Sequence, residues 1–206
     1  MPSTQIQQIG PYQIRTEIRR DPFSVTYQAF DTRNKQQLSL RVLDAELADT
    51  PTIVQRFIQA GQEAARLHHP NIIQIYEAGE LDGHPYITGE LVNGKTLLSL
   101  LIQRNKLLSP SEVTSIVQQI AAALDYAHEQ GLLHLDLNFR HVILNEEGQA
   151  LLADLGMSGF RQASALEKLA DLSVFTAPEQ ARGAYNIDYR ADLYSLGVIV
   201  YAMLVG

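Results

Sequence analysis

The first part of the chain, to about residue 90, alternates apolar and polar positions, the pattern of β-strands that bury one face. The alternating apolar positions are Tyr12, Ile14 and Ile18, then Val25, Tyr27 and Ala29, then Leu38, Leu40 and Val42. Turn residues at Asp31 to Asn34 join two of these runs, so the pattern predicts an antiparallel meander. Asp82-Gly83 predicts a further hairpin, with strands from Ile72 to Tyr76 and from Tyr86 to Leu91.

One helix interrupts the predicted strands. Thr50-Pro51 supplies an N-cap and a first-turn proline, and apolar residues then recur at helical spacing from Ile53 to Leu67. The dipeptide Asn93-Gly94 follows the last predicted strand and is typical of a hinge. The sequence therefore predicts a first lobe made of a sheet and one helix.

Beyond this hinge the pattern becomes helical. Ser109 to Glu112 combines a capping box with a first-turn proline, and a single apolar stripe continues to about Gly131. A short hairpin is predicted around Glu147-Gly148, and an apolar helix begins near Tyr189. A strand-rich half followed by a helix-rich half predicts an α+β fold with a cleft between the halves.

The composition is that of a globular protein, with 206 residues, 46% hydrophobic residues and a formal net charge of −7. The acidic balance argues against non-specific binding to nucleic acid or anionic membranes, because both require a basic surface. Polar residues interrupt the apolar stretch Leu193 to Val205, which therefore predicts a buried core helix rather than a membrane segment. Without cysteine the chain has no disulfide or thiolate site, which fits a cytoplasmic protein.

Several short motifs follow one another along the chain. They are His69-Pro70-Asn71-Ile72, Pro85-Tyr86-Ile87, His134-Leu135-Asp136-Leu137-Asn138-Phe139-Arg140-His141, Asp154-Leu155-Gly156, Ala177-Pro178-Glu179 and Asp192-Leu193-Tyr194-Ser195-Leu196-Gly197. Their order and spacing resemble those of eukaryotic-type protein kinases of the bacterial serine/threonine class, across about residues 10 to 206.

The resemblance implies a two-lobed, protein-kinase-like fold. Residues 1–9 would form an N-terminal tail, residues 10–92 an N-lobe with an antiparallel sheet and one helix, and residues 93–206 a mainly helical C-lobe. Because kinases continue with several further helices, the C-lobe is expected to be truncated at Gly206. An uncovered apolar face on the last helix then implies self-association, a protein partner or a segment of a longer protein.

The resemblance also implies where a nucleotide would bind. Asp136 stands at the position of the catalytic base, and Asp154 at the position that binds the metal and the nucleotide. Arg41 replaces the strand lysine that contacts phosphate, and Glu90 and Val92 stand at further nucleotide-contact positions. The implied cofactor is ATP with magnesium or manganese.

The phosphate-binding turn departs from the kinase pattern. Arg19, Asp21 and Ser24 stand where the loop of kinases has glycine, and Pro22 has no N–H to offer a phosphate. Asp21 would also bring negative charge toward phosphate. These features favour an ordinary strand turn over a phosphate cradle.

Three other positions leave alternatives open. Ala60 replaces the helix glutamate of kinases, so Glu63 either forms a shifted ion pair with Arg41 or faces solvent. His141 replaces the metal-binding asparagine and is either packed and hydrogen-bonded, which we favour, or a ligand of a softer metal. Gly89, at the gatekeeper position, either admits another ligand or is a strand glycine that a neighbouring side chain approaches closely.

These departures predict a pseudokinase, that is, a non-catalytic signalling or scaffold domain that binds protein partners and binds ATP weakly or not at all. One alternative is a weak serine/threonine kinase that transfers the γ-phosphate of ATP to protein hydroxyls with Asp136 and Asp154. The other is a nucleotide-binding switch without transfer. None of the three involves nucleic acid.

Overall fold

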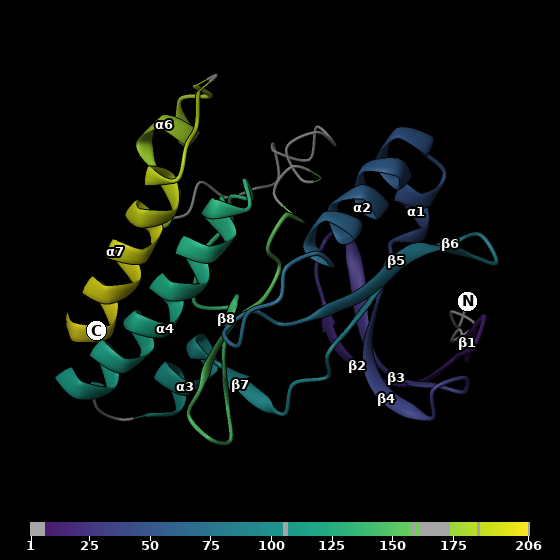
Figure 1. The fold of residues 1–206 in the computed structure, drawn as a ribbon, viewed down its shortest axis with the longest axis horizontal. Helices are drawn as coiled ribbons and strands as arrows, with labels where there is room; N and C mark the ends of the chain where they lie inside the picture. The colour runs from purple at the N-terminus through teal and green to yellow at the C-terminus, as the bar shows by residue number, and fades with distance from the viewer. Residues whose placement is uncertain (1–6, 105–106, 158–159, 161–173, 185, 206) are drawn as a thin grey trace. The chain divides into compact units, whose positions relative to one another are not determined.

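The computed structural model describes residues 7–104, 107–157, 160, 174–184 and 186–205. The chain folds into two compact units (Figure 1). The first unit comprises the chain up to Arg66 together with residues 74–91, and the second comprises residues 67–73 and the chain from Val92 onward. Each unit contains a sheet of its own.

The first unit is built on a six-stranded antiparallel sheet with the order β1-β2-β3-β4-β6-β5. Its strands are β1 Gln8–Ile9, β2 Tyr12–Arg20, β3 Ser24–Asp31, β4 Gln36–Leu43, β5 Ile75–Leu81 and β6 His84–Gly89. The predicted meander is confirmed, and apolar residues such as Tyr12, Ala29 and Leu40 form the core. Gln8–Ile9, which the prediction assigned to the tail, pair with β2 because Ile9 is fully buried in this core.

Two helices complete the first unit, α1 Ala45–Ala48 and α2 Pro51–Ala64. Thr50 is the N-cap of α2 and Pro51 lies in its first turn, as predicted. Helix α2 lies very close to the sheet because its Gly61 has no side chain. A Cβ atom at this position would come within 2.6 Å of the Ala78 Cβ and 2.8 Å of the Ile87 Cγ1.

The predicted turn at Asp82-Gly83 is confirmed, and both residues have positive φ, at 52° and 74°. Strand β5 begins later than predicted, at Ile75 rather than Ile72. The reason is that Ile72 is buried in the core of the second unit and forms an isolated bridge with Leu152. The apolar run that begins at Ile72 did not by itself indicate which of the two units buries it.

The second unit is mainly helical. Among the described residues its helices are α3 Leu97–Gln103, α4 Pro110–Glu129, α6 Pro178–Ala181 and α7 Arg190–Val205. Its three-stranded sheet contains β7 Gly94–Thr96, β8 Val142–Asn145 and β9 Ala150–Leu152. The predicted capping box is confirmed, since Glu112 N donates to Ser109 Oγ at 3.3 Å and Ser109 N donates to Glu112 Oε2 at 2.8 Å. The apolar stripe of α4 supplies much of the core.

Helix α7 buries only one of its faces. Ile199 and Met203 are fully buried, whereas Leu193 is 46% exposed and Tyr201 67% exposed. The prediction of a core helix therefore holds for one face of α7. None of the helices in the described part of the chain has the length and apolarity that crossing a membrane requires.

Candidate functional site

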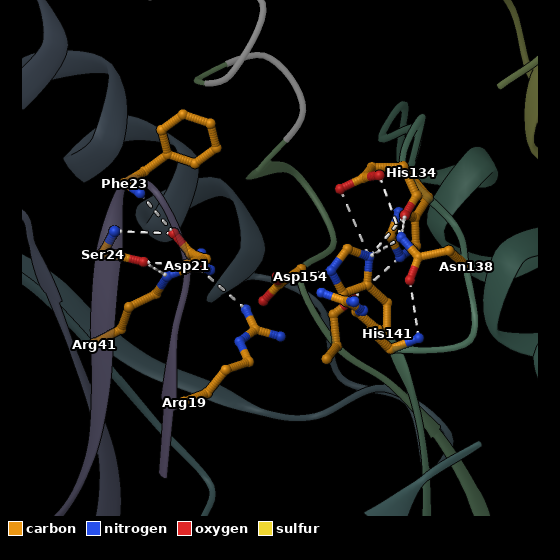
Figure 2. A network of polar contacts seen from close by, with 12 residues as sticks. Arg19, Asp21, Phe23, Ser24, Arg41, His134, Asn138, His141 and Asp154 are labelled. Carbon is orange, nitrogen blue, oxygen red and sulfur yellow. Dashed lines mark hydrogen bonds and ion pairs between the residues drawn. The ribbon is translucent and has the colours of Figure 1, made fainter. Parts of the chain in front are cut away.

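The turn between β2 and β3 is closed by the carboxylate of Asp21 (Figure 2). Asp21 Oδ1 accepts hydrogen bonds from Phe23 N and Ser24 N, both at 2.9 Å, and Asp21 Oδ2 accepts one from Ser24 Oγ at 3.0 Å. The Asp21 N–H also donates to the Ser24 carbonyl at 3.0 Å. The turn satisfies its own donors in this way, as the ordinary-turn alternative predicts.

Arg41 on β4 reaches the same carboxylate. Its Nη2 lies 2.7 Å from Asp21 Oδ2, its Nε donates to Ser24 Oγ at 2.7 Å, and the residue is only 7% exposed. Arg19 Nη2 lies 3.5 Å from the same Asp21 oxygen. Strand register explains the meeting, because Thr26 of β3 stands opposite Arg41 and the turn at Asp21 lies just beyond.

The pKa of the Asp21 carboxyl lies below its ordinary value. Burial acts to raise this pKa, but the positive charge of Arg41, the Phe23 N–H, the Ser24 hydroxyl and Arg19 together outweigh it. Asp21 is therefore a carboxylate at neutral pH, and its charge compensates that of a buried arginine.

Glu63 on α2 accepts a hydrogen bond from Gln59 Nε2 at 2.9 Å and is partly exposed. The carboxylate that contacts Arg41 at 2.7 Å is instead Asp21, so the solvent-facing alternative describes Glu63 better than the shifted ion pair does. Ala60, at the position of the helix glutamate of kinases, is buried.

The two predicted nucleotide-contact residues Glu90 and Val92 lie in the chain segment between β6 and β7. Glu90 is exposed, and its N–H donates to the Gln74 carbonyl at 2.8 Å. A Cβ on the neighbouring Gly89 would lie 2.8 Å from the Gln74 carbonyl oxygen and 3.1 Å from Ile75 Cδ1. Gly89 is thus a strand glycine that its neighbours approach closely, and contacts of Glu90 and Val92 with a nucleotide stay a prediction.

In the second unit, Asp192 holds the loop that carries Asp136. Its fully buried carboxylate accepts hydrogen bonds from His134 N at 2.9 Å and Leu135 N at 2.7 Å, and His128 Nε2 lies 2.8 Å away. Leu135 has a φ of 56°, a backbone conformation that is unfavourable for a side chain of this type. The hydrogen bonds to Asp192 compensate for this local strain.

His141 lies close to both aspartates of the predicted site, Asp136 and Asp154. Figure 2 shows its ring beside Asp154. Its Nδ1 is 2.7 Å from the Asp136 carbonyl oxygen, and its Nε2 is 3.3 Å from Asp154 Oδ2. Asn138 Nδ2 donates to the same Asp136 carbonyl at 2.9 Å. The structure therefore brings Asp136 and Asp154 together through a packed, hydrogen-bonded histidine, as the favoured alternative predicts.

His134 packs against this group with its ring stacked on that of His141 at a centroid distance of 5.6 Å. Its Nε2 lies 3.1 Å from the Ala153 carbonyl, while its buried Nδ1 has no hydrogen-bond partner among the described residues. Burial and then the charge of His141 lower the pKa of His134 to about 4. His134 is therefore neutral at pH 7, with its proton on Nε2.

Neither the side chains around Asp21 nor those around His141 fit a magnesium–triphosphate group. The turn N–H groups and Arg41 already contact Asp21, and an imidazole nitrogen, rather than an amide oxygen, faces the Asp154 carboxylate. Magnesium requires hard oxygen ligands. In the described part of the chain, no three potential ligand side chains are grouped to hold a metal ion.

The ion pair between Asp21 and Arg41 was missed in the sequence, where the two residues were considered separately. A signal was available, because an arginine on a strand with a buried face requires a carboxylate nearby. Asp21 is the acidic residue in the turn beside that strand.

Comparison with known proteins gives consistent matches. A family model described as "Protein kinase domain" matches residues 12–206. A probable serine/threonine-protein kinase of Streptomyces coelicolor is 35% identical over 204 residues, which cover 95% of this chain and 30% of that protein. The serine/threonine-protein kinase PknL of Mycobacterium bovis is 30% identical over 198 residues, which cover 95% of this chain and 49% of that protein. The chain thus spans less than half the length of these relatives.

A solved structure also matches along nearly the whole chain. The crystal structure of the PknI kinase domain of Mycobacterium tuberculosis has a TM-score of 0.77 and 30% sequence identity, and the match covers 96% of this chain and 75% of that one.

Proposed function

Because the chain belongs to the protein kinase domain family and has its α+β, two-lobed fold, we propose that it is a serine/threonine-kinase-like domain that signals without catalysis. In this pseudokinase role ATP binds weakly or not at all. Protein partners then recognise the surface of the domain rather than a product of its chemistry.

The observation that carries the proposal is the ion pair of Asp21 with Arg41 at 2.7 Å. Phosphoryl transfer depends on donors and cations that are positioned for the phosphates, and each missing contact of this kind costs about 3 kcal/mol of transition-state stabilisation. Here the turn donors and the strand cation contact an internal carboxylate. His141 at the position of a metal ligand supports the same proposal.

A second candidate function is a weak serine/threonine kinase. The names of the relatives favour this alternative over the pseudokinase role. The second unit also supports it, because Asp192 fixes the backbone next to Asp136 and because Asp154 lies close to the same loop through His141. A measurement of phosphate transfer distinguishes this weak kinase from the pseudokinase.

A thermal-shift titration with MgATP or MnATP, run beside an assay of labelled phosphate transfer to a protein substrate, tests the proposal. We expect no rise in unfolding temperature at millimolar ATP and no transfer. Ligand at a hundred times its dissociation constant would add about 2.7 kcal/mol, a shift of several degrees for a protein of this size. Transfer that Asp136→Asn abolishes and Asp125→Asn, on the exposed face of α4, preserves would refute the pseudokinase role.

A thermal shift without phosphate transfer would instead identify the nucleotide-binding switch. In that case Asp154→Asn is expected to abolish the shift, because this carboxylate is the group that stands at the metal and nucleotide position. The outcome separates binding from catalysis, since Asp136→Asn would leave the shift in place.

Binding to proteins is the remaining part of the proposal. It is supported by apolar side chains that α7 exposes, namely Leu193, Tyr201, Leu204 and Val205. Light scattering of the chain at increasing concentration, beside a Tyr201→Lys variant, measures self-association through this helix.

A cytoplasmic location stays a prediction from the absence of cysteine.

A further inference from the structure

Five polar contacts converge on the single carboxylate of Asp21. They come from Phe23 N at 2.9 Å, Ser24 N at 2.9 Å, Ser24 Oγ at 3.0 Å, Arg41 Nη2 at 2.7 Å and Arg19 Nη2 at 3.5 Å. All five come from β2, β3, β4 and the turn, within the first unit. Figure 2 shows the side chains of Ser24, Arg41 and Arg19 pointing toward this carboxylate.

Consecutive backbone N–H groups beside basic side chains are the donors from which proteins build sites for phosphate-type anions. In this turn the donors are present, but an anion of the chain itself occupies them. The carboxylate offers two oxygens to these donors, one fewer than a terminal phosphate group would offer. Its advantage is that it is covalently held beside them, at a high effective concentration.

We propose that Asp21 is an internal anion that masks a binding site for phosphate-type anions, formed by the β2–β3 turn and Arg41. This inference rests on the proposed function, since it gives a physical reason for the weak or absent ATP binding proposed there. The ligand class is a phosphate chain, whether free or attached to a nucleoside.

Asp31 provides a matched control within the same sheet. Its carboxylate also closes a turn and contacts an arginine, because it accepts hydrogen bonds from Arg33 N at 2.8 Å and Arg33 Nε at 3.2 Å. It is 1% exposed, and its removal takes one carboxylate away from Arg33, which keeps its ion pair with Glu77 at 3.2 Å. If Asp21 were only a structural turn residue, replacing either aspartate would have the same effect on anion binding.

The test is isothermal titration calorimetry with tripolyphosphate in the absence of divalent cations. The proteins compared are the wild-type chain, Asp21→Ala and Asp31→Ala. We expect Asp21→Ala to bind tripolyphosphate at least tenfold more tightly than the wild type and than Asp31→Ala. The double variant Asp21→Ala/Arg41→Ala should lose this gain. Equal affinity of wild type and Asp21→Ala, or an equal gain in Asp31→Ala, would overturn the proposal.

Asp21→Asn serves where the alanine variant does not fold. Asparagine keeps an oxygen acceptor for the two N–H groups but removes the charge, so a smaller gain in affinity, still above that of the wild type, is expected. A folded Asp21→Asn protein with wild-type affinity contradicts the inference as clearly as the alanine variant would.

Two further arms identify the ligand and separate this inference from the proposed function. Titration of Asp21→Ala with ATP and with adenosine shows whether the phosphate chain alone accounts for binding, because adenosine should then give no heat. Phosphate transfer by the wild-type chain would refute the proposed function and leave the comparison of Asp21→Ala with Asp31→Ala unaffected. The converse result, no transfer and no gain in Asp21→Ala, refutes only the masking by Asp21.

Discussion

The β2–β3 turn of the first unit and the Asp136 loop of the second unit have departed from the kinase pattern in different ways. In the turn the residues that replace the glycines and the lysine contact one another, since Asp21 and Ser24 both contact Arg41. In the loop Asp136 remains, and Asp192 holds the backbone of His134 and Leu135, the two residues before it.

The difference separates what the fold requires from what catalysis requires. Asp192 satisfies the buried N–H of His134 and the partly buried N–H of Leu135, a residue with positive φ, so the second unit needs it whether or not phosphate is transferred. The fold does not require particular residues in the turn in the same way, because different residues can close a turn between two strands. The presence of Asp136 in this loop is therefore only weak evidence for activity. The absence of the kinase glycines from the turn is stronger evidence against activity.

Replacement of Asp192 should have the largest effect on stability. Asp192→Ala leaves the N–H groups of His134 and Leu135 without their acceptor in the core, and we expect a loss of about 4 kcal/mol in the free energy of unfolding. Urea unfolding followed by circular dichroism measures this loss. Asp125→Ala removes an exposed carboxylate on α4 and should cause little change. Equal stability of the two variants would show that Asp192 does not hold the loop.

Breaking the turn's ion pair should have the next largest effect. Arg41→Met leaves the carboxylate of Asp21 partly buried without its main cation, with an expected loss of about 3 kcal/mol. In the double variant Asp21→Ala/Arg41→Met, the loss should fall about 2 kcal/mol short of the sum of the single losses. Additive losses in this double-mutant cycle would mean that the two residues act independently. Arg190→Met, in a surface pair, is the matched control.

His134 links the stability of the second unit to pH. Its pKa is about 4 in the folded chain, below the ordinary value of 6.5, so the unfolded chain binds a proton first as the pH falls. The contribution of His134 to the free energy of unfolding is fully present above about pH 6.5 and decreases as the pH falls toward 4. By pH 5 the loss is about 2 kcal/mol. Unfolding measured from pH 7 to pH 5 tests this slope. In His134→Phe the slope should become flatter, and an unchanged slope would assign it to other groups.

The sequence predicted local features well and long-range contacts poorly. The strands up to β4, the start of α2 and the capping box of α4 depend on periodicity and on neighbours a few residues apart, which the sequence shows directly. The assignment of Ile72 to a strand failed because which of two cores buries an apolar residue is a property of the tertiary structure. The start of β5 moved with it.

The candidate site shows the same limit. The family motifs placed Asp136 and Asp154 near one another, and the structure brings both to His141. The partner of Arg41 could not be predicted from spacing on a helix, because Asp21 lies twenty residues away and is brought close by strand register. Charge compensation of a buried arginine would have suggested a carboxylate, without identifying which one.

Glu63 should have the smallest effect and gives the sharpest test of which carboxylate compensates Arg41. Its side chain is partly exposed and accepts a hydrogen bond from Gln59, so Glu63→Gln should change the free energy of unfolding by about 0.5 kcal/mol or less. If Glu63 rather than Asp21 compensated Arg41, this variant would instead lose as much stability as Arg41→Met does. Measured side by side in urea, the two variants decide whether the arginine's charge is satisfied from helix α2 or from the turn.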